Sequence, residues 1–338
     1  MKLHPLSLLL GCLLLLSACN RELDVPARGT IRFTFDTETE PVSERKSTRV
    51  DENNVQNIHI LVYNQRGRRV GYDYFTAANN YRLEVPVGSG YTVYAIANTG
   101  NPTLFDDSRY NVQSALIEMT TPPLFLWVDI EQASHLLLSG MQTDIRVTPS
   151  VPGHESDTQV SLTLTRLVAR ITLNVGTEPN SGIAISNFQV FSLPRISYYL
   201  PRPLGGYPEF ENEIFDTYPY PGDDASRNDT DADWTDAFPI QLAQGSTAFG
   251  FQLYCYENRQ GVNPAITRQR DKNIHNAPLR ASYLLVKGTA PGYTSMNWRI
   301  YFGANATANF NIKRNATYNY NIILRATETD MRVEYQRQ

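Results

Sequence analysis

The sequence predicts an all-β protein with two tandem β-sandwich domains after a lipoprotein signal peptide. Its 338 residues suit about two domains of ordinary size. The 20 Pro and 20 Gly are scattered without a period, which disfavours a helix bundle and excludes collagen. Tyr, Thr, Asn and Val are abundant, and short apolar runs alternate with turn residues, as is typical of strands.

The charge balance limits the classes of partner. Lys and Arg number 30 against 34 Asp and Glu, which gives a formal net charge of -4. A protein that binds nucleic acid needs a broad basic face, and this balance argues against one. We therefore expect no nucleic-acid partner.

The first segment, residues 1–18, predicts export as a lipoprotein. Its apolar run of leucines is too short to span a bilayer comfortably, and no later stretch approaches 18 apolar residues. The sequence Leu16-Ser17-Ala18-Cys19 resembles a bacterial lipobox, in which the thiol of Cys19 forms a thioether with diacylglycerol and the chain is cut before it. Acylation, palmitate included, would then hold Cys19 in the outer membrane. An ordinary secretory signal is the alternative.

The N-terminal domain is expected over residues 19–155. Its first strand, residues 30–35, alternates strictly between apolar and polar side chains. The residues on its apolar face are Ile31, Phe33 and Phe35. A polar linker follows at residues 36–54. Further strands are predicted at residues 55–63, 68–74, 81–87, 91–97, 136–138 and 143–147, and a short helix at residues 111–119.

The second domain is expected over residues 156–338, because residues 148–157 are polar and rich in Pro and Gly. Residues 160–175 contain neither Gly nor Pro and predict one long strand or a pair of strands. Residues 194–239 form a long irregular stretch. The other strands are predicted at residues 183–193, 249–256, 281–287, 296–301, 310–312 and 318–325.

Motifs for catalysis, cofactors or metals are not found. The sequence lacks a phosphate-binding loop, a dinucleotide fingerprint, HExxH, CxxC and a GxSxG elbow. His59 lies in an apolar strand, and so does Cys255, the one cysteine left after Cys12 and Cys19. Both are expected to be buried structural residues. We predict no enzyme, no catalytic residue, no metal site and no cofactor.

Two acidic segments leave alternatives open. The loop at residues 223–236 contains Asp229, Asp231 and Asp233 but lacks the Gly and Glu that an EF-hand requires, so only a calcium site of another kind stays open. Glu211 and Glu213 have the spacing of two carboxylates on one strand face, which a glycosidase could use. Solvated loops are the simpler explanation for both.

The stretch at residues 194–239 is rich in tyrosine and proline. Rings held by rigid prolines would suit stacking on a sugar or on a protein partner. The alternative is a loop that folds back over its own sandwich and buries the rings. The candidate contact residues are Tyr198, Tyr199, Tyr207, Tyr218 and Tyr220.

Six segments, each a strand with its turn, carry a family resemblance together with the lipobox. They are residues 55–67 (VQNIHILVYNQRG), 91–100 (YTVYAIANTG), 164–173 (LTRLVARITL), 283–288 (YLLVKG), 298–303 (WRIYFG) and 310–320 (FNIKRNATYNY). In this order they resemble the fimbrillin superfamily of Bacteroidetes, the subunits of type V pili. The resemblance implies a transthyretin-like topology for both sandwiches, export as a lipoprotein, and a non-enzymatic role in pilus assembly or adhesion.

The resemblance also implies a mode of assembly. In stalk subunits of this family an Arg-specific protease removes the first strand, and the vacated groove accepts a strand from the next subunit. Arg45 and Arg49 would be the cleavage sites here, although an exposed basic loop explains them equally well. The strand that leaves would carry Ile31, Phe33 and Phe35. The C-terminal segment is the candidate donor or, alternatively, the last strand of its own domain, and its alternating residues are Met331, Val333 and Tyr335.

This interpretation makes the protein a structural subunit of a cell-surface fimbrium, as a stalk or tip adhesin. Its expected partners are other pilus subunits, outer-membrane lipid through Cys19, and a glycan or protein on a host or bacterial surface. One alternative is an anchor subunit that keeps both its first strand and its lipid. Another is a glycan-binding surface lipoprotein that uses residues 194–239.

Overall fold

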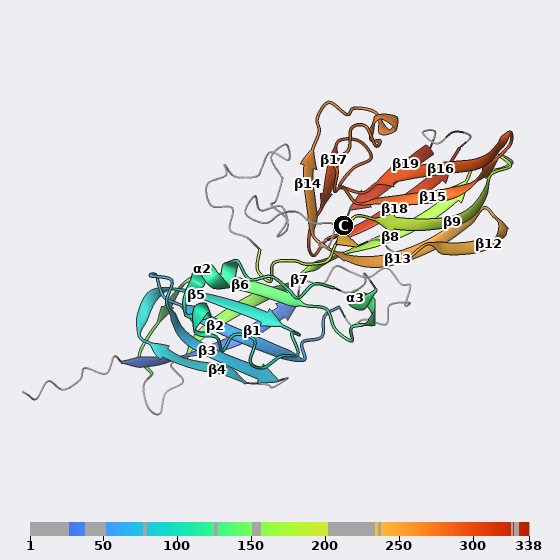
Figure 1. Cartoon of the computed structure of the whole chain (residues 1–338). Coiled ribbons are helices and arrows are strands. Elements are labelled where there is room, and N and C mark those ends of the chain that lie inside the picture. Colours follow the sequence, from blue (N-terminus) through green and yellow to red (C-terminus); the bar gives the residue numbers. More distant parts are fainter. Residues whose placement is uncertain are drawn as a thin grey trace, which may run out of the picture.

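The computed structural model describes residues 27–37, 52–76, 80–124, 128–150, 157–201, 234–235, 238–325, 327 and 331–337. Strands dominate this part of the chain, and they form two β-sandwich domains, one N-terminal and one C-terminal (Figure 1). The all-β fold class predicted from the sequence is therefore confirmed. None of the helices in these ranges is long and apolar enough to cross a membrane.

The N-terminal domain is built from one folded sheet in the order β3-β2-β5-β6-β7-β1-β4. Its strands are β1 (Arg28–Thr37), β2 (Asn57–Tyr63), β3 (Arg69–Thr76), β4 (Tyr81–Pro86), β5 (Gly88–Ala97), β6 (Leu138–Val147) and β7 (Thr158–Arg166). The sheet bends where β6 meets β7, because these strands pair only at Leu138–Arg166 and Ser139–Thr165. The two halves then enclose one core, since buried side chains of β1, β2, β5, β6 and β7 form a single cluster.

The C-terminal domain is a sandwich of two four-stranded sheets, β12-β9-β15-β16 and β13-β8-β18-β19. The strands of the first are β9 (Ala184–Phe191), β12 (Ile240–Ser246), β15 (Tyr283–Ala290) and β16 (Tyr293–Tyr301). Those of the second are β8 (Val168–Thr177), β13 (Ala248–Tyr256), β18 (Thr317–Leu324) and β19 (Met331–Arg337). Two short pairs complete the domain, namely β10 (Leu193–Pro194) with β11 (Trp234–Thr235), and β14 (Asn258–Val262) with β17 (Asn309–Ile312). Trp298, on β16, is the largest fully buried side chain of its core.

The junction between the domains lies at Leu167, which is 0% exposed, and not at the expected residues 155 and 156. β7 pairs with β1 and β6 in the N-terminal sheet, whereas β8 pairs with β13 and β18 in the C-terminal one. The chain thus passes from one domain to the other inside the run of residues 160–175. The polar segment at residues 148–157 instead connects two strands of the same sandwich.

The domains share a third buried cluster. β2 is buried on both faces, because His59, Leu61 and Tyr63 point away from the core that Ile58 and Ile60 fill. The short helices η1 (Ser108–Asn111), α2 (Gln113–Ile117) and α3 (Asp129–Gln132) lie in the connection between β5 and β6. The members of the cluster from the C-terminal part of the chain are Leu167, Val168, Tyr199, Leu200, Tyr254 and Tyr256.

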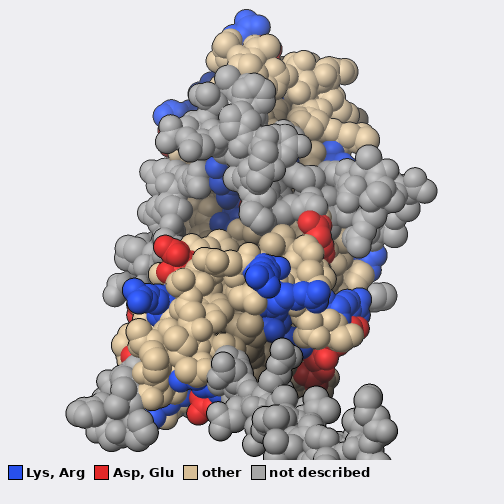
Figure 2. Space-filling view, turned by 90° about the vertical axis from the view of Figure 1, so that its left-hand side faces the viewer, with Lys and Arg blue, Asp and Glu red and all other residues tan. Residues whose placement is uncertain are grey.

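Acidic and basic side chains lie close to one another on the surface. Figure 2 shows Lys and Arg beside Asp and Glu on one face of the molecule. The ion pairs between exposed side chains include Arg109–Asp107 and Arg332–Glu334. Such pairs contribute little to stability, so the fold depends mainly on the buried apolar clusters of the described residues.

Replacing Leu200 with Ala tests the packing between the domains. Leu200 is 1% exposed within the shared cluster, so we expect a loss of about 2–5 kcal/mol in the free energy of unfolding, measured with urea. The control is Leu279→Ala, at a position 89% exposed, with a change of about 0.5 kcal/mol or less. Equal effects of the two substitutions would contradict the shared core.

Candidate strand-exchange site

β1 occupies an inner position of the N-terminal sheet. It pairs antiparallel with β4 and parallel with β7, and its last residue, Thr37, lies opposite Leu164. Residues 28–33 pair with β4 and residues 31–37 with β7, so β1 has a neighbour on both edges at residues 31–33. β4 pairs with no other strand among the residues described, so β1 connects it to the rest of the sheet.

The apolar face of β1 fills the core. Ile31 is 0% exposed and Phe33 is 3% exposed, while Phe35 is half-buried. The ring of Phe35 meets Tyr81 of β4 edge to face, with the centroids 5.0 Å apart. Full burial of one such side chain contributes about 1.5–3 kcal/mol. The alternation predicted for this strand is thus confirmed.

Polar contacts fix β1 at its start and along its exposed face. The Thr30 amide donates to the Ser150 hydroxyl at 3.0 Å. The Asp157 carboxylate lies 3.7 Å from the Arg32 guanidinium and 3.0 Å from that of Arg82. A strand that left this place would expose the edges of β4 and β7 and an apolar channel between them. Those are the features that bind an added strand.

The residues on either side of the segment that follows β1 both lie near the C-terminal end of β7. β1 ends beside Leu164, and Glu52 binds Arg166, the last residue of β7. Arg45 and Arg49 belong to the intervening residues 38–51, which lie outside the described residues. A cut anywhere in this segment would separate β1 from the chain and leave Glu52 in place.

Glu52 sits in a buried ion cluster at the junction of the domains. Its carboxylate binds the Arg166 guanidinium, and its Oε1 accepts from Arg170 Nη1 at 2.8 Å. The three side chains are 13%, 6% and 12% exposed respectively. Tyr254 donates its hydroxyl to the same carboxylate. Burial, and secondly the bond to Glu52, raises the pKa of Tyr254, so the hydroxyl stays protonated as a donor.

Sequence reasoning missed this cluster, although one signal was present. Arg166 and Arg170 interrupt an otherwise apolar run, and a buried guanidinium requires a partner. The partner is more than 100 residues away in sequence, so spacing could not identify it.

The C-terminal strand β19 lies at the edge of its own domain. Its residues Met331, Val333 and Tyr335 are partly buried against the C-terminal core. The ring of Tyr335 lies 5.5 Å from that of Tyr320. On the outer edge of β19, the Gln269 side chain donates to Met331 O at 2.6 Å and accepts from Val333 N at 3.0 Å. In this structure the segment therefore forms the last strand of its domain.

The structure corrects the expected exposure of two tyrosines. Tyr198 is 4% exposed and Tyr199 is 3% exposed, so neither ring is presented to a ligand. Tyr199 belongs to the cluster between the domains, and its ring centroid lies 6.3 Å from that of Phe105. Removing these two rings from water is favourable, which explains why the chain buries them. The other predictions for this region, and the predicted lipidation site, concern residues outside the described ranges. These are Tyr207, Tyr218, Tyr220, Glu211, Glu213, the acidic loop except for residues 234–235, and Cys19.

The two residues considered as a base and a nucleophile are structural. His59 is 0% exposed and contacts the Tyr72 hydroxyl at 3.1 Å and the Thr99 hydroxyl at 2.9 Å. Desolvation lowers the pKa of His59 to about 4, so its ring is neutral at pH 7. Burial raises the pKa of the Cys255 thiol to about 12, which leaves it unreactive. The burial predicted for both residues is confirmed.

Comparison with known families connects this fold to fimbrial proteins. Residues 27–166 match the family model described as major fimbrial subunit protein (FimA), which ends where β7 ends. Residues 253–322 match a domain of unknown function, DUF4906. No curated protein matches the sequence of the chain significantly.

Solved structures share the fold over almost the whole chain. A fimbrilin from Porphyromonas gingivalis W83 is similar with a TM-score of 0.55 and 14% identity, over 91% of this chain and 96% of that one. The tip fimbrial protein Mfa3 from Porphyromonas gingivalis, with a C-terminal truncation, is similar with a TM-score of 0.53 and 13% identity. The match covers 92% of this chain and 97% of that one. A putative cell adhesion protein from Parabacteroides distasonis is similar with a TM-score of 0.55 and 15% identity, over 92% of this chain and 96% of that one. The resemblance to the fimbrillin superfamily, predicted from the sequence, is confirmed over residues 27–166 by the family match, and the solved structures share the fold.

Replacing Glu52 with Gln tests the ion cluster. The substitution leaves two buried guanidinium groups without their carboxylate, so we expect a loss of about 3–5 kcal/mol in the free energy of unfolding. Glu334→Gln is the control, because its pair with Arg332 is 55% and 62% exposed and contributes at most about 1 kcal/mol. A neutral effect of Glu52→Gln in urea denaturation would show that the cluster is dispensable.

Proposed function

We propose that this protein is a subunit of a cell-surface fimbrium, exported as a lipoprotein through Cys19, that polymerises by strand exchange. The observation that carries the proposal is the place of β1. It is an inner strand whose side chains fill a core, yet it is the first of the described strands. One connecting segment joins it to the others. The residues at the two ends of that segment, Thr37 and Glu52, both lie beside the end of β7. Such a strand is removable by a single cut.

The cut would be hydrolysis of the peptide bond after Arg45 or Arg49 by an Arg-specific protease. The new amino terminus would be Lys46 or Val50. Glu52 would hold that terminus at the junction of the domains through its two arginines, so removal of β1 need not disturb the junction.

The entering strand would come from the C-terminus of another copy or of another subunit. β19 supports this role through its pattern, because Met331, Val333 and Tyr335 have the same two-residue spacing as Ile31, Phe33 and Phe35. It is an edge strand, paired on one side with β18 alone. In strand addition, backbone bonds supply the affinity and alternate side chains supply the specificity.

An anchor subunit that keeps β1 is the second candidate. The burial of Ile31 and Phe33 and the ion pairs of Asp157 favour it, since they stabilise β1 where it is. In that case the protein would stay in the outer membrane through acylated Cys19 and present the rest of its surface to other subunits. The glycan-binding alternative at residues 194–239 loses Tyr198 and Tyr199 as contacts, because both are buried.

Proteolysis of the folded protein distinguishes these roles. We expect an Arg-specific protease to cut after Arg45 or Arg49, and mass spectrometry of sheared surface material to find a chain beginning at Lys46 or Val50. The double variant Arg45→Ala/Arg49→Ala should resist, whereas Arg66→Ala, in the turn after β2, should be cut as before. A chain that always begins at acylated Cys19 would establish the anchor role instead.

A second variant pair tests donation by β19. Val333→Asp places a charge on the inward face of β19, whereas Glu334→Ala changes its neighbour on the other face. After cleavage, we expect Val333→Asp to abolish the ladder of polymers on a denaturant-free gel, with Glu334→Ala unchanged. Circular dichroism confirms that both variants are folded. Full polymerisation of folded Val333→Asp would exclude β19 as the donor.

A further inference from the structure

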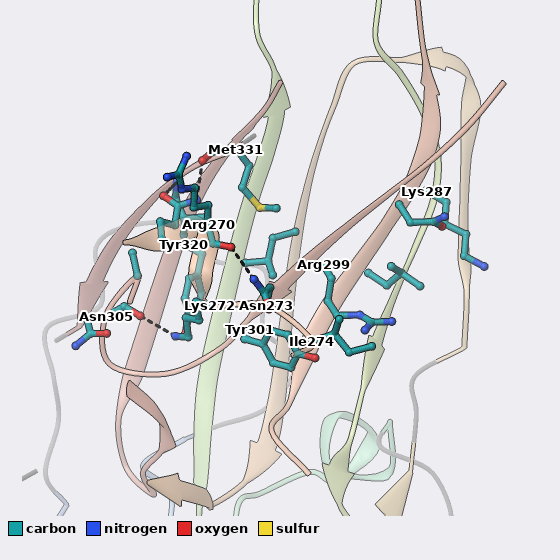
Figure 3. A pocket seen from close by; sticks show the side chains of 16 residues that line it. Arg270, Lys272, Asn273, Ile274, Lys287, Arg299, Tyr301, Asn305, Tyr320 and Met331 are labelled. Carbon is teal, nitrogen blue, oxygen red and sulfur yellow. Dashed lines mark hydrogen bonds between the residues drawn. The ribbon is translucent and has the colours of Figure 1, made fainter. Parts of the chain in front are cut away.

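A cavity of about 480 Å³ opens in the C-terminal domain, away from β1. It lies where the loop that contains η4 (Gln269–Asp271) meets β15, β16 and β19 (Figure 3). Gln269 fixes this loop to β19 through its two bonds to Met331 and Val333. Lys272 fixes it on the other side, because its ammonium donates to Asn305 O at 2.8 Å and Asn309 O at 2.6 Å. The cavity is therefore formed before any ligand enters, and its size is that of small-molecule sites.

Four cationic side chains line the cavity. They are Arg270 and Lys272 from the loop, and Lys287 and Arg299 from β15 and β16. The residues that line the cavity include neither Asp nor Glu. The nearby Asp271 carboxylate is bound instead by Arg268, at 2.8 Å.

The buried arginines that form ion pairs elsewhere in the described chain differ from these four side chains, of which Arg270 and Lys287 are exposed. The buried Arg166 and Arg170 share Glu52, and the buried Arg314 binds Glu257 at 3.1 Å. No described carboxylate pairs with any of the four cations in the cavity. Burial lowers the pKa of Lys272 to about 7, so its amine is only partly charged at pH 7, and it donates to two backbone carbonyls; the charge offered to a ligand therefore comes from Arg270, Lys287 and Arg299. Cations gathered without counter-charge are typical of a site that awaits an anion.

Arg299 is oriented for such an anion. Its guanidinium lies over the Tyr283 ring, 4.7 Å from the centroid, and its buried Nε has no hydrogen-bond partner among the described residues. Arg299 is opposite Leu285, and Lys287 is two residues further along β15, so the two cations share the outer face of the sheet as diagonal neighbours. A planar guanidinium with a free donor matches a carboxylate, and a second cation beside it strengthens that preference.

The other walls suit a ring that carries both apolar faces and hydroxyl groups. Figure 3 shows the Tyr301 ring and Ile274 beside Arg299. Burial raises the pKa of Tyr301, and the hydroxyl, which is hydrogen-bonded to the Arg299 side chain, stays protonated. Amide side chains, among them Asn273, complete the lining. Aromatic and aliphatic surface combined with amides and hydroxyls favours a sugar over a purely apolar acid.

We propose that this cavity binds an acidic saccharide whose carboxylate is held by Arg299 and Lys287, with its ring against Tyr301. The site is separate from β1 and would act in a stalk, tip or anchor subunit alike.

Calorimetric titration of the full chain tests the proposal. The probes are glucuronic acid and N-acetylneuraminic acid, with glucose, acetate and a blocked dipeptide with a free carboxyl terminus as comparisons. We expect an acidic sugar to bind at least ten-fold more tightly than glucose and acetate. Binding of neither acidic sugar, or binding of acetate or the dipeptide as tightly as an acidic sugar, would overturn the proposal.

Matched variants locate the binding. Arg299→Gln should weaken binding of the acidic sugar at least ten-fold, since a charged hydrogen bond is lost. The control Arg332→Gln changes an arginine of β19 that is 62% exposed and does not line the cavity, and it should bind as the parent does. Lys287→Gln gives a second, independent test on an exposed side chain that carries no described ion pair. Unchanged affinity in both cavity variants would place the sugar elsewhere and exclude the site, whatever the outcome for polymerisation.

Discussion

The N-terminal sandwich depends on the pairing of β1 with two strands at once. β1 is the first strand in sequence, yet it lies between β4 and β7 and supplies Ile31 and Phe33 to the core. β7 comes last in that domain and leads directly into the C-terminal one. The pairing of β1 with β7 thus connects the beginning of the chain with the strand that joins the domains. Loss of the first strand would therefore expose one edge of the strand that leads into the C-terminal domain.

The positive charges of the domain junction and those of the cavity in the C-terminal domain have different partners. At the junction, Glu52 offsets two buried arginines, and the hydroxyl of Tyr254 completes its hydrogen bonding. In the cavity, four cations are gathered with no described carboxylate among the lining residues. Desolvation makes the buried charges of the junction costly without a counter-charge, and Glu52 supplies it from within the chain. In the cavity Arg270 and Lys287 are exposed to water, and under our proposal the carboxylate of a ligand supplies the counter-charge.

Most strands of the described chain were predictable from the sequence. Their side chains either alternate between apolar and polar or, where both faces of the strand are buried, are apolar throughout. The first strand and the double burial of β2 are examples, and so is the structural role of His59. The domain boundary was wrong because polar turn residues were taken as a linker. The better signal lay in residues 160–175, where the buried positions change from Val160, Leu162 and Leu164 to Ala169, Ile171 and Leu173. That shift of phase marks the passage between sheets. Neither the partner of Arg166 nor the cavity was predictable, because each joins residues that only the fold brings together.

Leu167 has a mechanical consequence. One buried residue separates the last strand of the first domain from the first strand of the second, and a shared apolar cluster covers the joint. The two domains consequently have no flexible tether, and a bending or pulling load passes from one to the other without a hinge. Any stiffness or compliance in an assembly of such chains would therefore arise at the contacts between molecules.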